Sequence, residues 1–314
     1  MENFIYSINT TFPIFLVMAL GWGLRQKGMF NENFVTVANK FNFTVTLPFM
    51  LFRDLSAVDI YGTFDLSYVA FCAVVSSVCF FAIWGFAKIF VREKEMRGAF
   101  VQASFRSSAA VMGLAFIENI YGSSAMGPMM IIGAVPLYNI YSVIVLTFEG
   151  TEGKIDTSKI KAAAVNILKN PIIIAIFLGI LASMSGLRFP TVIHKTIDNV
   201  AKMATPLALV TMGAGFKGKE ALAKIKPTLA AAFIKLIAQA AVFVPVAAKL
   251  GFSGEKMIGI LIMLAAPATP SCYIMAKNMN GDGDLTASVV VVTTLFAAFT
   301  LTGWIFILKT LGFL

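Results

Sequence analysis

Two prolines interrupt an apolar stretch of the chain, residues 264–273, which has the sequence LAAPATPSCY. Pro267 and Pro270 each remove a backbone donor and clash with the preceding turn, so an α-helix through this stretch must open. Thr269 is placed as the N-cap of a restarted helix and Pro270 as its first residue. The positive N-terminal end of that half-helix, with Ser271 beside it, would attract an anion. We therefore expect half of an anion-binding site here.

A single arginine, Arg106, interrupts a second apolar stretch. It follows Arg97 by nine residues, or about 14 Å along a helix, which places it near the centre of a bilayer. A charged side chain at that depth is costly and faces the protein interior with a partner. The partner is either a substrate carboxylate, which a guanidinium can hold by two parallel hydrogen bonds, or a fixed group such as Glu118 or a backbone carbonyl. Both alternatives remain open.

Small polar residues complete the candidate substrate site. Ser107 and Ser108 follow Arg106, and Asn139 lies close to Pro136 in a later apolar stretch. Their hydroxyl and amide groups either contact substrate or hold helices together, as small polar residues in membrane proteins often do. The candidate substrate-binding residues are Arg106, Ser107, Ser108, Asn139, Pro267, Thr269, Pro270 and Ser271.

Enzymatic chemistry has little support in the sequence. It contains no Walker A, HExxH or GxSxG motif and no cluster of acidic residues. Its three cysteines, Cys72, Cys79 and Cys272, lie in apolar segments without the spacing of a metal site or a disulfide framework. We therefore predict a protein that is not an enzyme, has no metal site or cofactor, and does not use ATP directly.

The composition indicates what must position these residues. Of 314 residues, 58% are hydrophobic and 13% are charged, and the mean hydropathy is +0.84, far from the usage of soluble domains. The net charge of +9 is assigned to membrane orientation, because no nucleic-acid-binding motif accompanies it. The predicted fold class is an all-α polytopic membrane protein.

A membrane-spanning helix needs about 20 mostly apolar residues. This criterion predicts ten transmembrane helices, at 4–25, 33–53, 66–91, 97–121, 125–148, 162–186, 190–215, 221–249, 255–279 and 285–311. Most lysines and arginines of the links lie on one side, in links such as 25–28, 92–95 and 149–161. The positive-inside rule places that side in the cytoplasm and both termini outside the cell.

The two halves of the chain resemble each other. Pro13 and Pro171 are separated by 158 positions, and so are Pro48 and Pro206. Each pair lies in a similar apolar context. A fixed offset of this kind is the signature of an internal repeat, and we predict two repeats of five helices each.

The first repeat is predicted over 1–148, a cytoplasmic linker over 149–161, and the second repeat over 162–314. Because five is odd, the second repeat enters the membrane from the opposite face, and the repeats are inverted. Helices four and nine then occupy equivalent places. We expect both to be broken, at 106–113 and 265–272, and to cross at mid-depth beside the substrate.

Other polar residues within the predicted spans are given structural roles. Thr44 and Thr46 are expected to bond back to carbonyls one turn earlier. Asp198 and Lys202 form a predicted i,i+4 pair. Lys235 interrupts the predicted helix 221–249, and its long stem is expected to carry the ammonium group toward the membrane surface.

Several segments resemble the auxin efflux carrier family. They are 170–174 (NPIII), 206–214 (PLALVTMGA), 267–271 (PATPS) and 276–282 (AKNMNGD). Members of this family include the plant PIN-formed auxin exporters and bacterial carriers associated with malate, malonate and similar organic anions. The short linker at 149–161 is like that of the bacterial members. The chain departs from the family pattern at Ser108, where many relatives carry asparagine, and at Ala115, where they carry proline.

The resemblance implies a scaffold and a transport domain, with helices four and nine crossing as broken helices over a carboxylate site. It also implies an elevator-like movement of the transport domain and suggests homodimers. We therefore predict a secondary active transporter of small organic anions in the bacterial plasma membrane, with malate, malonate or auxin-like acids as substrates.

Coupling to protons, to sodium or to the membrane potential stays open, because Glu118 is the only acid clearly within a predicted span near the crossing. One alternative is a sodium-coupled organic-anion symporter similar to bile-acid carriers, and another is a non-transporting membrane sensor. The predicted partners are the anionic substrate, the lipid bilayer and H⁺ or Na⁺, without nucleic acid.

Overall fold

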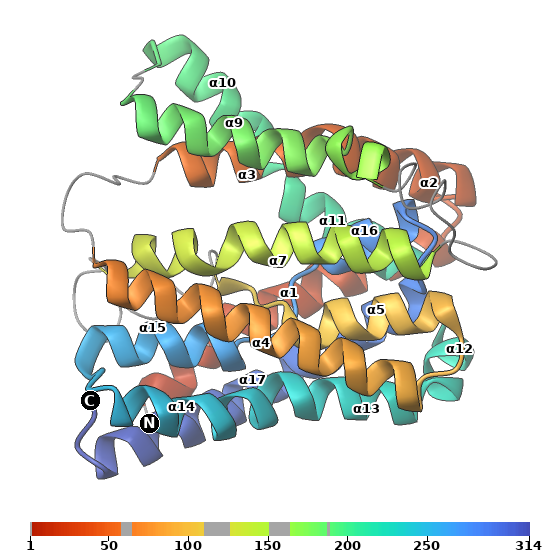
Figure 1. Ribbon diagram of the computed structural model, residues 1–314. Helices are drawn as coiled ribbons and strands as arrows, with labels where there is room; N and C mark the ends of the chain where they lie inside the picture. Colours follow the sequence, from red (N-terminus) through yellow and green to blue (C-terminus); the bar gives the residue numbers. More distant parts are fainter. Residues whose placement is uncertain (1, 58–64, 110–125, 151–163, 187–188) are drawn as a thin grey trace.

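The structure is a computed structural model that describes residues 2–57, 65–109, 126–150, 164–186 and 189–314 (Figure 1). Within these ranges the regular elements are helices, and no strand occurs among them. In chain order, and besides a helical stretch at 164–168, they are α1 (Glu2–Gln26), α2 (Glu32–Phe41), the π-helical η1 (Asn42–Thr46), α3 (Leu47–Ser56), α4 (Leu66–Phe90), α5 (Lys94–Phe105), α7 (Gly127–Glu149), α9 (Pro171–Ser185), α10 (Thr191–Lys202), α11 (Ala204–Gly215), α12 (Gly218–Ala223), α13 (Ile225–Phe233), the π-helical η3 (Ile234–Ala238), α14 (Gln239–Lys249), α15 (Gly254–Ala265), α16 (Ser271–Asn278) and α17 (Gly283–Thr310). The all-α prediction is therefore confirmed over the described part of the chain.

Four continuous helices among the described residues are long and apolar enough to cross a membrane. They are Leu66–Phe90, Gly127–Glu149, Ile225–Lys249 and Gly283–Thr310. Each coincides with a predicted span. Shorter apolar helices cover Phe12–Gln26 and Pro171–Ser185. The total of ten spans stays a prediction, because only four uninterrupted helices of the described residues are long and apolar enough to span a membrane.

Other predicted spans are divided into consecutive pieces. Around Pro48, the helical path passes from α2 through η1 into α3, and Pro48 lies in the first turn of α3. Around Pro206, α10 and α11 meet at Met203. A proline in the first turn of a helix removes a donor that the helix does not use there, so each proline is accommodated by starting a new helical segment. Both prolines therefore coincide with a change of helical segment.

Two glycines allow pairs of helices to pack backbone against backbone. A Cβ atom on Gly21 of α1 would lie 2.2 Å from the carbonyl oxygen of Val210 in α11. A Cβ atom on Gly179 of α9 would lie 3.2 Å from the carbonyl oxygen of Phe52 in α3. Gly179 follows Gly21 by 158 positions, and Val210 follows Phe52 by the same number. The contact between α1 and α11 thus has a counterpart between α9 and α3, with the halves of the chain exchanged.

The centre of the molecule is formed by α5 and α15. All of α5 from Gly98 to Phe105 is buried, and so is all of α15 from Met257 to Ala265. The two helices enter from opposite ends of the molecule and stop near its middle, surrounded by α4, α7, α13 and α17 (Figure 1). Backbone groups freed at a helix end in this position are covered by protein, which is the condition for tolerating a broken helix at membrane depth.

An ion pair fixes the start of α4 to the start of α15. Asp65 is the N-cap of α4, and its carboxylate accepts a hydrogen bond from the Lys256 ammonium group of α15. The Ser67 hydroxyl and the Tyr68 amide also donate to it, at 2.6 and 3.1 Å. These donors, Lys256 first, hold the pKa of Asp65 well below its usual range. The carboxylate therefore stays charged at neutral pH and holds the two helix ends together.

Candidate functional site

The two broken helices meet where each of them ends. After Phe105, Arg106 leaves the helical path with φ −81° and ψ 129°. After Ala265, Ala266 does the same with φ −68° and ψ 154°. The extended segments touch directly, because the Ser108 amide donates to the carbonyl oxygen of Pro267 at 2.9 Å. The interruption predicted at 265–272 is present, and the chain opens at Arg106 as predicted. Of the predicted 106–113 interruption, positions 110–113 lie outside the described residues.

The second half of the helix restarts one residue later than predicted. We predicted Thr269 as N-cap and Pro270 as the first helical residue, whereas α16 begins at Ser271 and Pro270 occupies the cap position. As an N-cap, the Thr269 hydroxyl would accept a hydrogen bond from the amide of Cys272. That amide donates instead to the Thr269 carbonyl, at 2.9 Å. The Thr269 hydroxyl lies 3.1 Å from the Ser271 hydroxyl. The two hydroxyls therefore form a polar pair at the start of α16.

Side chains satisfy the last carbonyls of α15. The Ser107 hydroxyl lies 3.1 Å from the carbonyl oxygens of both Ile262 and Ala266. The Tyr138 hydroxyl of α7 donates to the carbonyl of Met263 at 2.8 Å. For Ser107, the contact matches the alternative in which a small polar residue holds helices together. Its single hydroxyl donor is directed at the end of α15.

Two side chains of one helical span reach both broken ends. The Lys235 ammonium group donates to the carbonyl of Leu264 at 2.5 Å, and the Gln239 amide donates to the carbonyl of Ser104 at 2.6 Å. Lys235 is fully buried, so the expectation that its stem carries the charge to the membrane surface is wrong. Burial of the ammonium group against a carbonyl is favoured, because the last carbonyls of α5 and α15 have no partner within their own helices. These carbonyls lie next to the face of the span that carries Lys235 and Gln239.

Arg106 is buried and contacts the predicted site residue Asn139. Its Nη2 donates to the Asn139 side-chain oxygen at 2.8 Å, and its Nη1 contacts the Met275 sulfur at 2.7 Å. The Asn139 amide in turn donates to the carbonyl of Val135 at 2.9 Å. Among the described residues, no carboxylate forms an ion pair with Arg106. The alternative partner Glu118 lies outside them.

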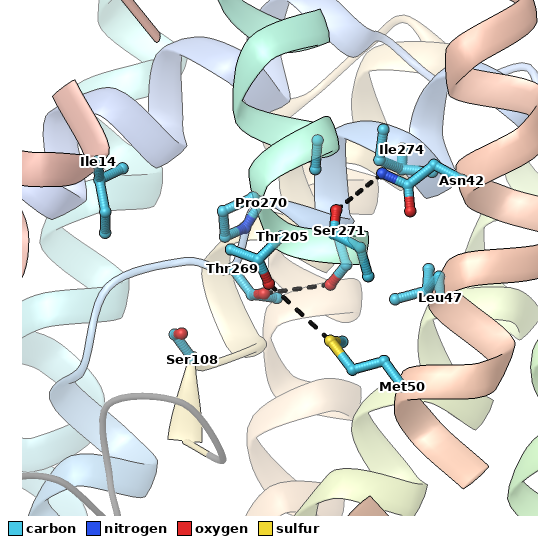
Figure 2. Close-up of a pocket in the computed structure, with 12 residues that line it drawn as sticks. Ile14, Asn42, Leu47, Met50, Ser108, Thr205, Thr269, Pro270, Ser271 and Ile274 are labelled. Atoms are coloured by element: carbon cyan, nitrogen blue, oxygen red, sulfur yellow. Dashed lines mark hydrogen bonds between the residues drawn. The ribbon is translucent and has the colours of Figure 1, made fainter. Parts of the chain in front are cut away.

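A cavity of about 140 Å³ lies on one side of the crossing (Figure 2). One water molecule needs about 10–15 Å³ on this measure, so a small organic molecule has room here. The predicted residues Ser108, Thr269, Pro270 and Ser271 form one wall. A smaller space of about 30 Å³ adjoins Arg106, Ser107 and Asn139, and it shares Ser108, Thr269 and Ser271 with the first. Pro267 lines neither space, and its role is the backbone contact with Ser108.

The comparison with known sequences places the chain among transporters. The profile of a family described as "Membrane transport protein" matches residues 6–305. The chain belongs to this family. The predicted membership in the auxin efflux carrier family is thereby confirmed. With its long apolar helices, the protein is an integral membrane transporter.

Two curated relatives cover nearly the whole chain at low identity. The uncharacterized transporter YfdV of Escherichia coli K12 is 22% identical over 301 residues, which are 91% of this chain and 94% of that protein. An uncharacterized transporter of Methanothermobacter thermautotrophicus is 21% identical over 309 residues, which are 96% of this chain and 98% of that protein. Both are described as transporters, and neither description names a substrate.

The opposite wall of the transporter's cavity includes residues outside the predicted set. Asn42, Met50 and Thr205 line it from η1, α3 and α11. The Asn42 amide donates to the carbonyl of Ala204 at 2.9 Å, and the Thr46 hydroxyl donates to the Asn42 side-chain oxygen at 2.6 Å. A signal was present in the sequence, since these polar residues lie close to the prolines of predicted helices two and seven. The sequence did not indicate which face of these two helices would be turned toward the broken helices.

Two further structural assignments are confirmed. The Thr44 hydroxyl donates to the carbonyl of Lys40 at 2.8 Å, the predicted bond to the preceding turn. The predicted pair of Asp198 and Lys202 is present at 2.5 Å, and Arg53 of α3 contacts Asp198 at 3.2 Å. This ion-pair cluster links α3 to α10 and is separate from the walls of the 140 Å³ cavity.

Proposed function

We propose that this protein is a secondary active transporter that moves small carboxylates across the plasma membrane by an elevator-like, alternating-access mechanism. The observation that carries the proposal is the position of Arg106. Its buried guanidinium lies at the crossing of two broken helices, against a neutral amide and a sulfur atom. A buried cation with only neutral partners favours binding of an anion, because the attraction of an anion would offset the cost of keeping the guanidinium charge out of water.

The chemistry around Arg106 favours a small carboxylate as the anion. A guanidinium has five N–H donors, so further donors remain after the contacts to Asn139 and Met275. The hydroxyls of Thr269 and Ser271 add polar groups on the same wall. Malate and malonate have the size and charge for such a site. Auxin-like acids are a second candidate, because apolar side chains such as Ile14 and Ile274 line much of the cavity.

The reciprocal helix contacts support the inverted repeats on which alternating access depends. The pair Gly21 and Val210 corresponds to the pair Gly179 and Phe52 when the halves of the chain are exchanged. A two-fold relation between the repeats 1–148 and 162–314 would produce this exchange. We include it in the proposal, with residues 149–161 as the cytoplasmic linker between the repeats.

The location of the cavity supports an elevator-like movement. One wall belongs to α1, η1, α3 and α11. The other belongs to the segments that follow the broken helices α5 and α15, and to the start of α16. Within the first group α1 packs closely against α11, and η1 contacts both α3 and α11; α3 also packs closely against α9. Movement of the second group past the first would carry a bound anion across the membrane.

Uptake into proteoliposomes tests the proposal. Radiolabelled malate, malonate and indole-3-acetate would be offered to vesicles containing the wild-type protein, Arg106→Ala, or the control Arg92→Ala, which removes an exposed arginine. We expect uptake of at least one acid by the wild type and the control, and a loss of about 100-fold in Arg106→Ala. Uptake of none of the acids, or equal uptake by Arg106→Ala and the wild type, would refute the proposal.

The orientation of the chain is part of the same proposal. The distribution of lysine and arginine in the links supports two extracellular termini. A C-terminal fusion to alkaline phosphatase is expected to be active, because that enzyme matures outside the bacterial cytoplasm, and a fusion to green fluorescent protein is expected to be dark. The reverse pattern would contradict this orientation.

A further inference from the structure

We propose that the Lys235 ammonium group is a tethered cation that replaces a dissociable alkali cation at the crossing, so that transport requires neither Na⁺ nor K⁺. The inference rests on the proposed anion transport and adds to it the identity of the cation that compensates the broken helices. It also decides against the sodium-coupled symporter considered from the sequence.

The surroundings of Lys235 are those of a cation site built from carbonyl groups. Lys235 lies in the π-helical turn η3 and is fully buried. A π-helical turn is a local widening that proteins frequently use at functional positions. From this turn the ammonium group reaches the carbonyl of Leu264, 2.5 Å away and one residue before the last residue of α15. Its hydrogen-bonding partner is thus the C-terminal end of a broken helix.

The end of α15 has a negative potential that needs compensation. A helix C-terminus carries a partial charge of about −0.5, which is most costly where water is excluded. Neutral hydroxyls bind the neighbouring carbonyls, with Tyr138 at Met263 and Ser107 at Ile262. Lys235 supplies the full positive charge at Leu264.

No acidic side chain of the described residues forms an ion pair with Lys235. The side chain therefore does not act as one half of a salt bridge there. In transporters with discontinuous helices, unwound carbonyls and half-helix C-termini of this kind coordinate a coupling Na⁺. In this protein a covalently attached ammonium group occupies the equivalent electrostatic position.

A tethered cation has a functional consequence that a dissociable one does not have. Na⁺ bound at the carbonyls would be exchanged with solution in each transport cycle and would couple the sodium gradient to the substrate. Lys235 stays in place, so it compensates the helix end whether or not an anion is bound near Arg106. Transport is then driven by the membrane potential or a proton gradient, without a stoichiometric alkali cation.

The first test is anion uptake by proteoliposomes in which Na⁺ and K⁺ are replaced by N-methyl-D-glucamine. Wild-type uptake is expected to change by less than about twofold. Lys235→Ala is expected to lose more than about tenfold in this buffer and to recover when Na⁺ or ethylammonium is added. The control Lys249→Ala, which removes an exposed lysine farther along the same span, is expected to behave as the wild type under all conditions.

Three results would overturn the inference. They are wild-type uptake that depends on Na⁺ or K⁺, normal uptake by Lys235→Ala in N-methyl-D-glucamine, and a loss in Lys235→Ala that neither cation restores. Lys235→Gln separates charge from hydrogen bonding, because it keeps a donor without the charge. Normal alkali-free uptake by Lys235→Gln would also overturn the inference.

Thermal unfolding in detergent supplies a measurement that does not depend on the substrate. Na⁺ or ethylammonium is expected to raise the melting temperature of Lys235→Ala more than that of the wild type or Lys249→Ala, because only the first variant has a cation site to fill. Equal shifts in all three proteins would overturn the inference. If the wild type transports none of the acids offered, the proposed function fails, while this measurement still tests the cation site.

Discussion

The ends of the two broken helices differ in how positive charge reaches them. The end of α5 is followed in its own chain by Arg106, which contacts Asn139 beside the smaller cavity, and its last turn receives the neutral amide of Gln239. The end of α15 is followed by apolar residues and proline, and it receives a charge from another span through Lys235. One cation lies at a cavity wall, and the other is enclosed against a carbonyl.

This difference indicates a division of work between two buried cations. A cation at a cavity wall can change its partner when a ligand enters, so Arg106 is suited to recognition. A cation held at 2.5 Å from a helix-end carbonyl, with no exposed surface, keeps its partner. Lys235 is therefore suited to permanent compensation. The comparison predicts that substitution of Arg106 changes anion uptake, whereas substitution of Lys235 changes the requirement of transport for an added cation.

The largest expected effect is on transport at the end of α5. Arg106→Gln keeps hydrogen-bonding groups but removes the charge that would hold a carboxylate, at a cost of about 3 kcal/mol, or roughly 100-fold in transport efficiency. The melting temperature is expected to fall little, because the variant no longer buries a charge. Initial uptake rates and thermal unfolding, compared with Arg92→Gln, measure both quantities. If Arg106→Gln takes up substrate as fast as the wild type, Arg106 does not recognise the anion.

The next effect is on stability at the same helix end. Gln239→Leu leaves the buried carbonyl of Ser104 without the donor now 2.6 Å away, which costs about 1–3 kcal/mol. Thermal unfolding of the purified protein measures it. The exposed-site substitution Lys226→Leu serves as control. A melting temperature of Gln239→Leu no lower than that of the control would show that Gln239 does not support the end of α5.

A smaller effect distinguishes two adjacent serines. Ser107→Ala removes the donor shared by Ile262 and Ala266 and is expected to cost about 1 kcal/mol of stability with an unchanged KM. Ser108→Ala alters a wall common to both cavities and is expected to raise KM by about tenfold at most, without a stability loss. Melting temperature and concentration-dependent uptake, measured on both variants, test this split. The opposite pattern would exchange the two roles.

The smallest effect is expected far from the crossing, at Asp65. Its pKa is lowered in the folded protein, chiefly by Lys256, so the pair stabilises the fold above the unfolded-state pKa of about 3.9, and that stability is lost as the pH falls below it. Because both side chains are partly exposed, Asp65→Asn should cost no more than about 1 kcal/mol at neutral pH. Melting temperatures of wild type and variant should converge on acidification. A constant difference would contradict the role of this ion pair.

Local rules predicted the features whose causes are local. The opening of the chain between Ala265 and Ser271 follows from two prolines, which disrupt a helix in almost any surroundings. The bond from Thr44 to Lys40 and the pair of Asp198 and Lys202 join residues four positions apart. Spacing alone brings such residues together on a helix.

Local rules failed where two orientations were equally compatible with the sequence. Lys235 could extend toward the membrane surface or turn toward the interior, and the choice depends on whether unpaired carbonyls lie within reach. The cap of α16 shows the same limit, because the Cys272 amide had two competing acceptors on Thr269, its hydroxyl and its carbonyl. For Lys235 the partner was supplied by another helix, 29 positions away. For Cys272 both acceptors belong to one nearby residue, and the local rule did not rank them.

The sequence by itself determined that the chain lies in a membrane, that it is interrupted at 265–272, and that Arg106 enters an apolar region and needs a partner. Composition, proline geometry and the cost of a buried charge are sufficient for these conclusions. The tertiary structure decided which side chains meet the broken ends. Gln239 is 135 positions from Ser104, and Lys235 is 29 positions from Leu264. Partners so distant are fixed by how the helices pack around the crossing, because carbonyls withdrawn from water accept whichever donor the packed helices bring within reach.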